Sequence, residues 1–137
     1  MKKLKVYLDT SVIGGCFDDE FKGDSKKLIK QIQQDLRIGV ISEITLAEIK
    51  DAPFEVRNYF EKFNDKLLTL KITHEVEELA SLYLKDKIVG PKFINDCLHI
   101  AVATVYDVEL LASWNFKHIV NYDKIIRFNS VNFKKRI

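Results

Sequence analysis

Short apolar runs alternate along the chain with longer segments in which apolar residues recur every three or four positions. The short runs are rich in strand-forming residues and predict four strands, at Lys5–Leu8, Val40–Ile41, Leu67–Ile72 and Glu109–Ala112. The segments between them have the spacing of amphipathic helices. Buried strands that alternate with helices are typical of a parallel sheet covered on both faces. The pattern therefore predicts an α/β fold.

Polar and chain-breaking residues mark the expected ends of the helices. Residues suited to capping a helix N-terminus precede four helical segments: Ser25, Ser42, Thr73 and Asn95, the last opening a helix from about Asp96 to Tyr106. Pro53 suits the first turn of a further helix. Interruptions are expected as a turn at Asp9–Thr10–Ser11, a break at Gly14–Gly15 and a helix end at Gly39. From Phe116 onward the spacing suits a helix, although residues 124–128 alone also fit a strand.

Composition indicates one compact domain spanning residues 1–137. Of the 137 residues, 47% are hydrophobic and 31% are charged, which is ordinary for a globular protein. No apolar run approaches the 18 or so residues of a membrane-spanning helix, and the N-terminal apolar stretch is too short for a signal peptide. The two cysteines, Cys16 and Cys97, have no zinc-binding spacing, so a reduced, cytoplasmic setting is expected.

The net charge of +2 is too small to indicate a nucleic-acid partner by itself. Basic residues do gather in two places, at Lys26, Lys27 and Lys30 and at Lys134, Lys135 and Arg136. Solvated surface lysines are the simpler interpretation of either cluster taken alone. If the clusters flank an acidic site, they would be able to bind a phosphate backbone.

Four oxygen-bearing residues stand where an apolar segment ends or a helix begins: Asp9, Glu48, Asp96 and Asn115. In a parallel α/β sheet these places lie together, in the crevice outside the carboxyl ends of the strands. Three carboxylates and an amide converging there would repel one another unless a hard cation sat among them. The pattern therefore indicates metal-dependent chemistry at this edge.

Each of these residues also has a purely structural interpretation. Asp9 suits a turn, Asp96 and Asn115 suit helix N-termini, and Glu48 suits a solvent-facing helix position. Two further glutamates compete with Glu48 for its place, namely Glu20 and Glu43. If Asn95 supplies the cap of its helix, Asp96 is free to point into the crevice. The small residues Thr10 and Ser11 would be able to hydrogen-bond a carboxylate or a metal-bound water.

Several other chemistries are excluded by missing motifs. The chain contains neither GxGxxG nor GxxxxGK[ST], so it lacks the phosphate cradles of nucleotide-binding folds, and it contains no GxSxG. The cysteines lack a local nucleophile signature. The three histidines, His74, His99 and His118, are scattered without zinc spacing, and His99 is interpreted as an interior or surface histidine with its hydrogen bonds satisfied.

At this point the chain resembles the PIN-domain family, and within it the small VapC-like toxins of toxin–antitoxin systems. The stretches that carry the resemblance are VYLDTSVI at 6–13, ISEITLAEI at 41–49, NDCLHIAVA at 95–103 and LASWNFKHIVN at 111–121. They follow the family's order and span nearly the whole chain. The resemblance implies a three-layer α/β/α sandwich with a central parallel sheet of four or five strands. The last edge strand is expected to be missing or very short.

The resemblance also implies roles for individual residues. Asp9, Glu48 and Asp96 are the expected acidic triad that binds Mg²⁺ or Mn²⁺, and Asn115 stands where many members hold a further aspartate. Around them, Thr10, Ser11 and Ser113 are expected to hydrogen-bond the carboxylates or the metal-bound waters. The implied activity is metal-dependent endonucleolytic cleavage, most often of RNA, with a 5′-phosphate and a 3′-hydroxyl as products.

The sequence therefore predicts a metal-dependent endoribonuclease, the toxin of a type II toxin–antitoxin pair. RNA is the expected substrate, a cognate antitoxin and a second copy of the chain are the expected protein partners, and no membrane association is expected. The alternative is a catalytically silent PIN-like module that binds RNA or a partner protein, for which Asn115 in place of an acid is the supporting feature. A flavodoxin-like receiver domain, whose acidic crevice also holds Mg²⁺, fits the wide spacing of Glu48 and Asp96 poorly.

Overall fold

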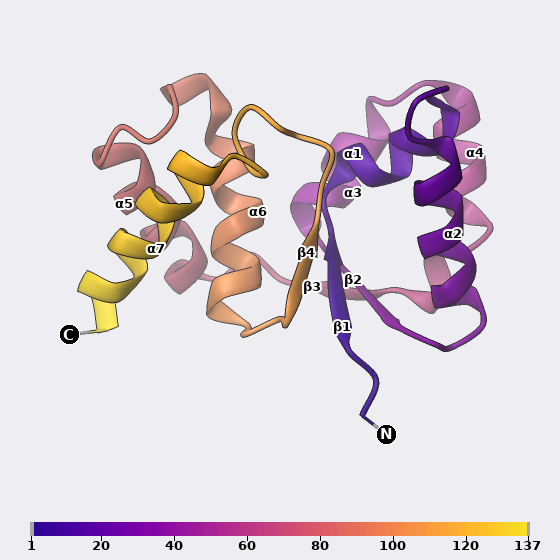
Figure 1. The fold of residues 1–137 in the computed structure, drawn as a ribbon, viewed down its shortest axis with the longest axis horizontal. Coiled ribbons are helices and arrows are strands. Elements are labelled where there is room, and N and C mark those ends of the chain that lie inside the picture. The colour runs from indigo at the N-terminus through magenta and orange to yellow at the C-terminus, as the bar shows by residue number, and fades with distance from the viewer. Residues whose placement is uncertain (1, 137) are drawn as a thin grey trace.

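An all-parallel sheet forms the centre of the structure, a computed structural model that describes residues 2–136 (Figure 1). Its four strands are β1 (Lys5–Leu8), β2 (Ile38–Ser42), β3 (Leu68–Leu70) and β4 (Leu110–Ala112), in the order β3-β2-β1-β4. Tyr7 is the register partner of Val40 on one side and of Leu111 on the other. All four predicted strands are confirmed, with shifts of up to two residues at their ends.

Helices cover both faces of the sheet, which confirms the predicted three-layer α/β/α sandwich. The helices are α1 (Thr10–Gly14), α2 (Lys22–Gln33), α3 (Glu43–Lys50), α4 (Phe54–Glu61), α5 (His74–Lys85), α6 (Ile94–Val105) and α7 (Tyr122–Arg136), with short 3₁₀ turns η1 (Gly15–Phe17), η2 (Asn64–Lys66) and η3 (Pro91–Phe93). In Figure 1, α5, α6 and α7 lie on one side of the sheet and α2 and α4 on the other. Helices α1 and α3 lie near the carboxyl ends of the strands.

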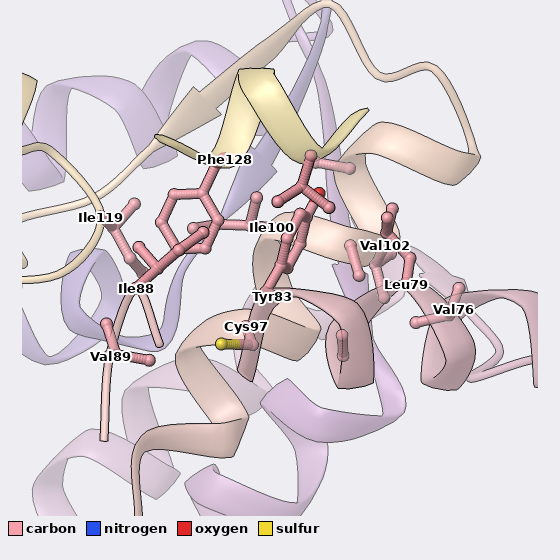
Figure 2. Packing of buried hydrophobic residues seen from close by; sticks show 14 of the residues in the cluster. Val76, Leu79, Tyr83, Ile88, Val89, Cys97, Ile100, Val102, Ile119 and Phe128 are labelled. Atoms are coloured by element: carbon pink, nitrogen blue, oxygen red, sulfur yellow. The ribbon is translucent and has the colours of Figure 1, made fainter. Parts of the chain in front are cut away.

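The alternation of side chains along β1 divides the interior into two cores. Val6 and Leu8 pack into the core on the side of α2 and α4, whereas Tyr7 packs into the core beneath α5, α6 and α7. Figure 2 shows part of the second core, where the rings of Tyr83 and Phe128 meet edge to face at 4.8 Å. Because both faces of β1 are buried, its sequence is an apolar run and not an alternating one.

Two of the predicted helix caps are confirmed in full. The side chain of Ser42 accepts the backbone N–H of Ile44, while Thr45 Oγ1 accepts the Ser42 N–H, and together they close a capping box at the start of α3. Thr73 caps α5 by accepting the Val76 N–H. These caps position α3 and α5 directly after β2 and β3.

The predicted turn at Asp9–Thr10–Ser11 is wrong, and at the predicted break, Gly14–Gly15, α1 ends but a 3₁₀ turn continues the chain. The chain continues from Asp9 into α1 and then η1, and both glycines have right-handed helical dihedrals. A glycine is needed at position 15 because the surrounding atoms leave no room for a side chain, and not because of its backbone conformation. A Cβ added there would lie 2.7 Å from Ser25 Oγ and 2.8 Å from Trp114 Nε1.

The expected boundaries of the second helix are also wrong. Ser25 lies inside α2, whose N-cap residue is Phe21, and the buried Ser25 hydroxyl instead accepts the Trp114 indole N–H at 2.8 Å. Gly39 does not end this helix but lies within β2, where a Cβ would meet Leu67 and Ile32. Tertiary packing of polar and small residues, which local sequence does not show, explains these differences.

Two predictions in the second half of the chain need correction, and one is confirmed. Asn95 is not the N-cap of α6, because the helix begins at Ile94 after η3. The helix expected from Phe116 begins only at Tyr122, and residues 124–128 belong to it and form no strand. Within residues 2–136 no strand follows β4, as expected for the last edge strand. No helix in this range is long and apolar enough to cross a membrane.

The two neighbouring glycines allow a matched test of packing around Trp114. Gly14→Ala adds a methyl group where no atom lies within 4 Å, so we expect an unfolding free energy that is unchanged or raised by up to about 1 kcal/mol. Gly15→Ala forces the new methyl group against Ser25 and Trp114, so we expect a loss of about 1–3 kcal/mol. Urea unfolding monitored by tryptophan fluorescence measures both, and equal stabilities would contradict the close packing.

Candidate functional site

Asp9 is the most buried of the predicted acidic residues, with 5% of its surface exposed. It directly follows β1, and its backbone N–H donates to the Ala112 carbonyl at the end of β4. Its Oδ2 accepts hydrogen bonds from Ser11 Oγ at 2.6 Å and from Ser113 Oγ at 2.9 Å. Two hydroxyl groups from separate segments therefore hold one carboxylate oxygen at the carboxyl edge of the sheet.

Glu48 reaches the same edge from α3. Its Oε1 accepts Thr10 Oγ1 at 2.7 Å and lies 2.6 Å from His99 Nε2. Burial alone would raise the pKa of Glu48, but the hydrogen bonds from His99, the Thr10 hydroxyl and the Asn95 amide lower it below its usual 4.5. Glu48 is therefore ionised at neutral pH. Neither competitor takes this place, since Glu43 accepts the Ile72 N–H at the end of β3 and Glu20 is exposed before α2.

His99 links the first two acids and is fully buried. Its Nε2 lies 2.6 Å from Glu48 Oε1 and 3.5 Å from Asp9 Oδ1, and its Nδ1 lies 2.6 Å from the Tyr7 hydroxyl. Burial, offset in part by bonds to Ser42 and Thr45, raises the pKa of Tyr7 to about 12, so this hydroxyl stays protonated. The interpretation of His99 as a satisfied interior histidine is right, but sequence reasoning missed that its hydrogen-bond partners are Glu48 and Tyr7.

Asp96 lies in the first turn of α6, three residues before His99 and so on the same side of the helix. Its Oδ2 lies 2.7 Å from Nδ1 of His118, a buried residue of the loop between β4 and α7. The ring of His118 packs against Phe93 with centroids 4.1 Å apart. A second histidine therefore pairs with the third acid, and the sequence offered no spacing signal for that pairing.

Asn115 uses its side chain for the backbone. Its Oδ1 accepts the His118 N–H at 2.9 Å, and its own N–H donates to Ser113 Oγ at 2.9 Å. The carbonyl of Asn115 accepts the N–H groups of Ile119 and Val120. Asn115 thus shapes the loop that carries His118, which agrees with the capping interpretation of this residue.

The three carboxylates have an unusual set of partners. Within residues 2–135 none of them pairs with a lysine or arginine, and imidazole and hydroxyl groups take that place. In the same part of the chain, no group of three or more histidine, cysteine, aspartate and glutamate side chains stands ready to hold a metal ion. The donors themselves fit a hard divalent cation, because they are carboxylate oxygens at one edge of the sheet without a fixed cationic partner.

Thiol chemistry is disfavoured at this site. Cys97 follows Asp96 directly, and burial, with a smaller contribution from the Asp96 charge, raises its pKa to about 12. Burial also raises the pKa of Cys16. Both cysteines are unpaired and buried, so at neutral pH they act as small apolar core residues.

Aromatic and basic side chains border the acids. Lys92 and Lys117 are exposed, and their Nζ atoms lie 5.1 Å and 5.9 Å from the Phe93 ring centroid, next to His118. On the β4 side Trp114 stacks on Phe21 at 4.4 Å, and Phe116 beside them is 54% exposed. These groups would be able to contact a phosphate backbone and unstacked bases.

The two basic clusters seen in the sequence differ in position. Lys26, Lys27 and Lys30 lie exposed on α2, the helix that Ser25 ties to Trp114. The C-terminal cluster lies at the end of α7, away from the carboxyl ends of the strands (Figure 1), and Lys135 there pairs with Glu78 at 2.8 Å. The C-terminal cluster therefore does not flank the acids.

Comparisons with known proteins bear on the fold. The chain matches no protein-family model, and no curated protein matches it. Among solved structures it is similar to a chain in the crystal structure of VapBC2 from Rickettsia felis bound to a DNA fragment from their promoter. The TM-score is 0.58 at 17% sequence identity, and the match covers 83% of this chain and 90% of that chain. At this identity the likeness shows that the two chains share the α/β fold.

Proposed function

We propose that this protein is a metal-dependent endoribonuclease. The observation that carries the proposal is the set of Asp9, Glu48 and Asp96 at one edge of the sheet, paired with histidines but with no lysine or arginine in residues 2–135. Partly buried carboxylates are costly unless opposite charge compensates them. A bound divalent cation would supply that charge, and oxygen donors are those that Mg²⁺ and Mn²⁺ prefer.

The proposed metal ligands are Asp9, Asp96 and Glu48. A bound Mg²⁺ or Mn²⁺ supplies a more acidic water and stabilises charge on phosphoryl oxygens during in-line displacement. The hydroxyl groups of Ser11 and Ser113 donate hydrogen bonds to Asp9, and that of Thr10 donates to Glu48. Each of these carboxylates therefore has a defined orientation before the ion binds. Glu48 is ionised at neutral pH and partly exposed, which suits it to orient the attacking water by accepting a hydrogen bond from it.

The surroundings of the acids suit a single-stranded or looped RNA. Lys92 and Lys117 are exposed and would contact phosphates next to Asp96. The exposed ring of Phe116 would stack on a base, since aromatic stacking is the usual way in which proteins bind unpaired bases. With these contacts, the scissile phosphate would lie between the lysines and the three carboxylates.

The biological setting that we propose is a toxin–antitoxin pair. The fold is that of a chain in a VapBC2 complex, and it supports a VapC-like PIN toxin with a cognate antitoxin as partner. A homodimer and a cytoplasmic location stay predictions. Exposed apolar side chains on α7, among them Tyr122, Ile126 and Phe133, would be available to such protein partners.

The second candidate is a catalytically silent PIN-like module that binds RNA or a protein. The observation that favours it is Asn115, whose side-chain oxygen is committed to the His118 N–H and which brings no charge. In that case the histidines alone would compensate the acids. Metal binding separates the two functions.

Cleavage of a mixed pool of tRNA and structured RNA tests the proposal. With Mn²⁺ or Mg²⁺ we expect discrete cuts that EDTA abolishes, and we expect Asp9→Asn and Asp96→Asn to lower the rate by about 100-fold or more, because each removes a charged metal ligand. Asp65→Asn is the matched control, since Asp65 is exposed in η2 before β3, and it should cut at the wild-type rate.

Calorimetry with Mn²⁺ alone and gel-shift binding of the same RNA complete this experiment. Wild-type protein that binds RNA but neither binds Mn²⁺ nor cuts would overturn the nuclease and favour the silent module. Asp96→Asn that cuts as fast as wild type would overturn the assignment of the site while leaving the activity intact.

Asn115 allows a test of the charge at the site. Asn115→Asp keeps an acceptor for the His118 N–H and adds one negative charge, so we expect Mn²⁺ to bind about 10-fold more tightly, or about 1.4 kcal/mol. Asn64→Asp, at the opposite end of the sheet in η2, makes the same chemical change and should leave the affinity unchanged. Calorimetry measures both, and equal affinities for Asn115→Asp and wild type would show that residue 115 does not face the ion.

A further inference from the structure

A chain of hydrogen bonds passes through His99, and the backbone of α3 closes it into a ring. From His99 on α6, one side of the imidazole contacts Glu48 on α3, and the other contacts the Tyr7 hydroxyl on β1. Tyr7 in turn lies 2.8 Å from Ser42 Oγ. Ser42 is the N-cap of α3, the helix that carries Glu48. The ring therefore begins and ends on the same helix.

We propose that His99 is a positioning residue for the acidic site: its imidazole, oriented by Tyr7, holds Glu48 beside Asp9 in the arrangement that binds the divalent cation. This inference rests on the proposed function. It assigns a role to a histidine that would not itself touch the metal or the substrate.

The chemistry of the ring determines the direction of its hydrogen bonds. An ionised carboxylate only accepts, so Nε2 of His99 donates to Glu48. In the neutral imidazole the other nitrogen accepts, and Tyr7 donates to it. Ser42 can then donate to the Tyr7 oxygen while its own oxygen accepts the Ile44 N–H. Every polar atom of the ring has a partner of the right kind.

Burial gives this arrangement its rigidity. Tyr7 and His99 are fully buried, and their rings pack edge to face with centroids 5.5 Å apart. Glu48, by contrast, has a side chain that is 31% exposed and rotates about three bonds. Holding such a side chain in one rotamer costs up to about 1.5–2 kcal/mol of conformational entropy. Because His99 and Thr10 already hold Glu48 in the metal-free protein, metal binding does not bear this entropic cost.

Three variants separate the contacts of the ring. His99→Leu removes both hydrogen bonds at similar volume, His99→Gln keeps an N–H donor that can reach Glu48, and Tyr7→Phe removes only the hydroxyl that orients His99. We expect His99→Leu to weaken Mn²⁺ binding by about 10–100-fold, His99→Gln to stay within about 5-fold of wild type, and Tyr7→Phe to fall between them. Calorimetry with Mn²⁺ alone measures the affinities.

Two further readouts distinguish positioning from loss of structure. In the metal-free protein, NMR relaxation of the Glu48 side-chain methylenes should show greater mobility in His99→Leu than in wild type. In the cleavage assay at saturating Mn²⁺, kcat should fall while KM for RNA stays within about 3-fold. Tyr83→Phe is the matched control, because Tyr83 is an equally buried tyrosine whose hydroxyl donates to Asn132 on the far side of the sheet from α2. It should lower the melting temperature without changing Mn²⁺ affinity.

The outcomes discriminate between this inference and the proposed function. Wild-type protein that binds no Mn²⁺ overturns both. Wild-type binding that His99→Leu leaves unchanged, with Glu48 equally ordered in both proteins, overturns the role of His99 alone. His99→Gln that behaves like His99→Leu would show that donation to Glu48 is not what matters, and this too overturns the inference. If His99→Leu does not fold, the comparison of Tyr7→Phe with Tyr83→Phe decides.

Discussion

Asp9, Glu48 and Asp96 are carboxylates for which residues 2–135 supply no lysine or arginine partner, and the free-energy cost of this unpaired charge is the constraint on which the structure around them depends. Asp9 is almost completely buried, so water does little to screen it. Hydroxyl and imidazole groups contact the carboxylates in the places where lysines or arginines would form fixed ion pairs. Such neutral or weakly charged partners stabilise the carboxylates while leaving negative charge at the edge. The negative charge that remains at this edge is what the proposed cation site requires.

The same side chains serve the core and the site, so the two are not separable. Tyr7 is a core residue beneath α5, α6 and α7, and its hydroxyl is also the contact that orients His99. Ser25 is a buried residue of α2, and its hydroxyl also accepts the indole N–H of Trp114, the neighbour of Ser113. The parallel register brings the ends of β1 and β4 level, which lets Ser113 reach Asp9. A change of packing on either face of the sheet would therefore alter the positions of the carboxylates.

The sequence predicted the sheet and the three layers, because these follow from hydrophobic pattern and parallel topology. It placed Thr10, Ser11 and Ser113 near the acids, and the structure brings each of them into contact with Asp9 or Glu48. It failed where a residue's partner is distant in sequence. Ser25 was interpreted as a helix cap because its true partner, Trp114, lies 89 positions away in the sequence. The hydrogen-bond partners of His99 and His118 lie up to 92 positions away. No local pattern encodes such pairs.

The two histidines hold the acids in different ways, and this makes the site asymmetric. His99 belongs to α6, in the middle of the fold, and a hydrogen bond between its Nδ1 and the Tyr7 hydroxyl fixes its ring. His118 belongs to the loop between β4 and α7, where the turn shaped by Asn115 positions it. A helix between two packed layers has fewer low-energy rearrangements than a surface loop. The side of Asp9 and Glu48 is therefore the rigid part of the site, whereas Asp96 meets the side that can adjust. A substrate that has to enter and leave would do so along the loop side, where Lys117 and Phe116 are also exposed.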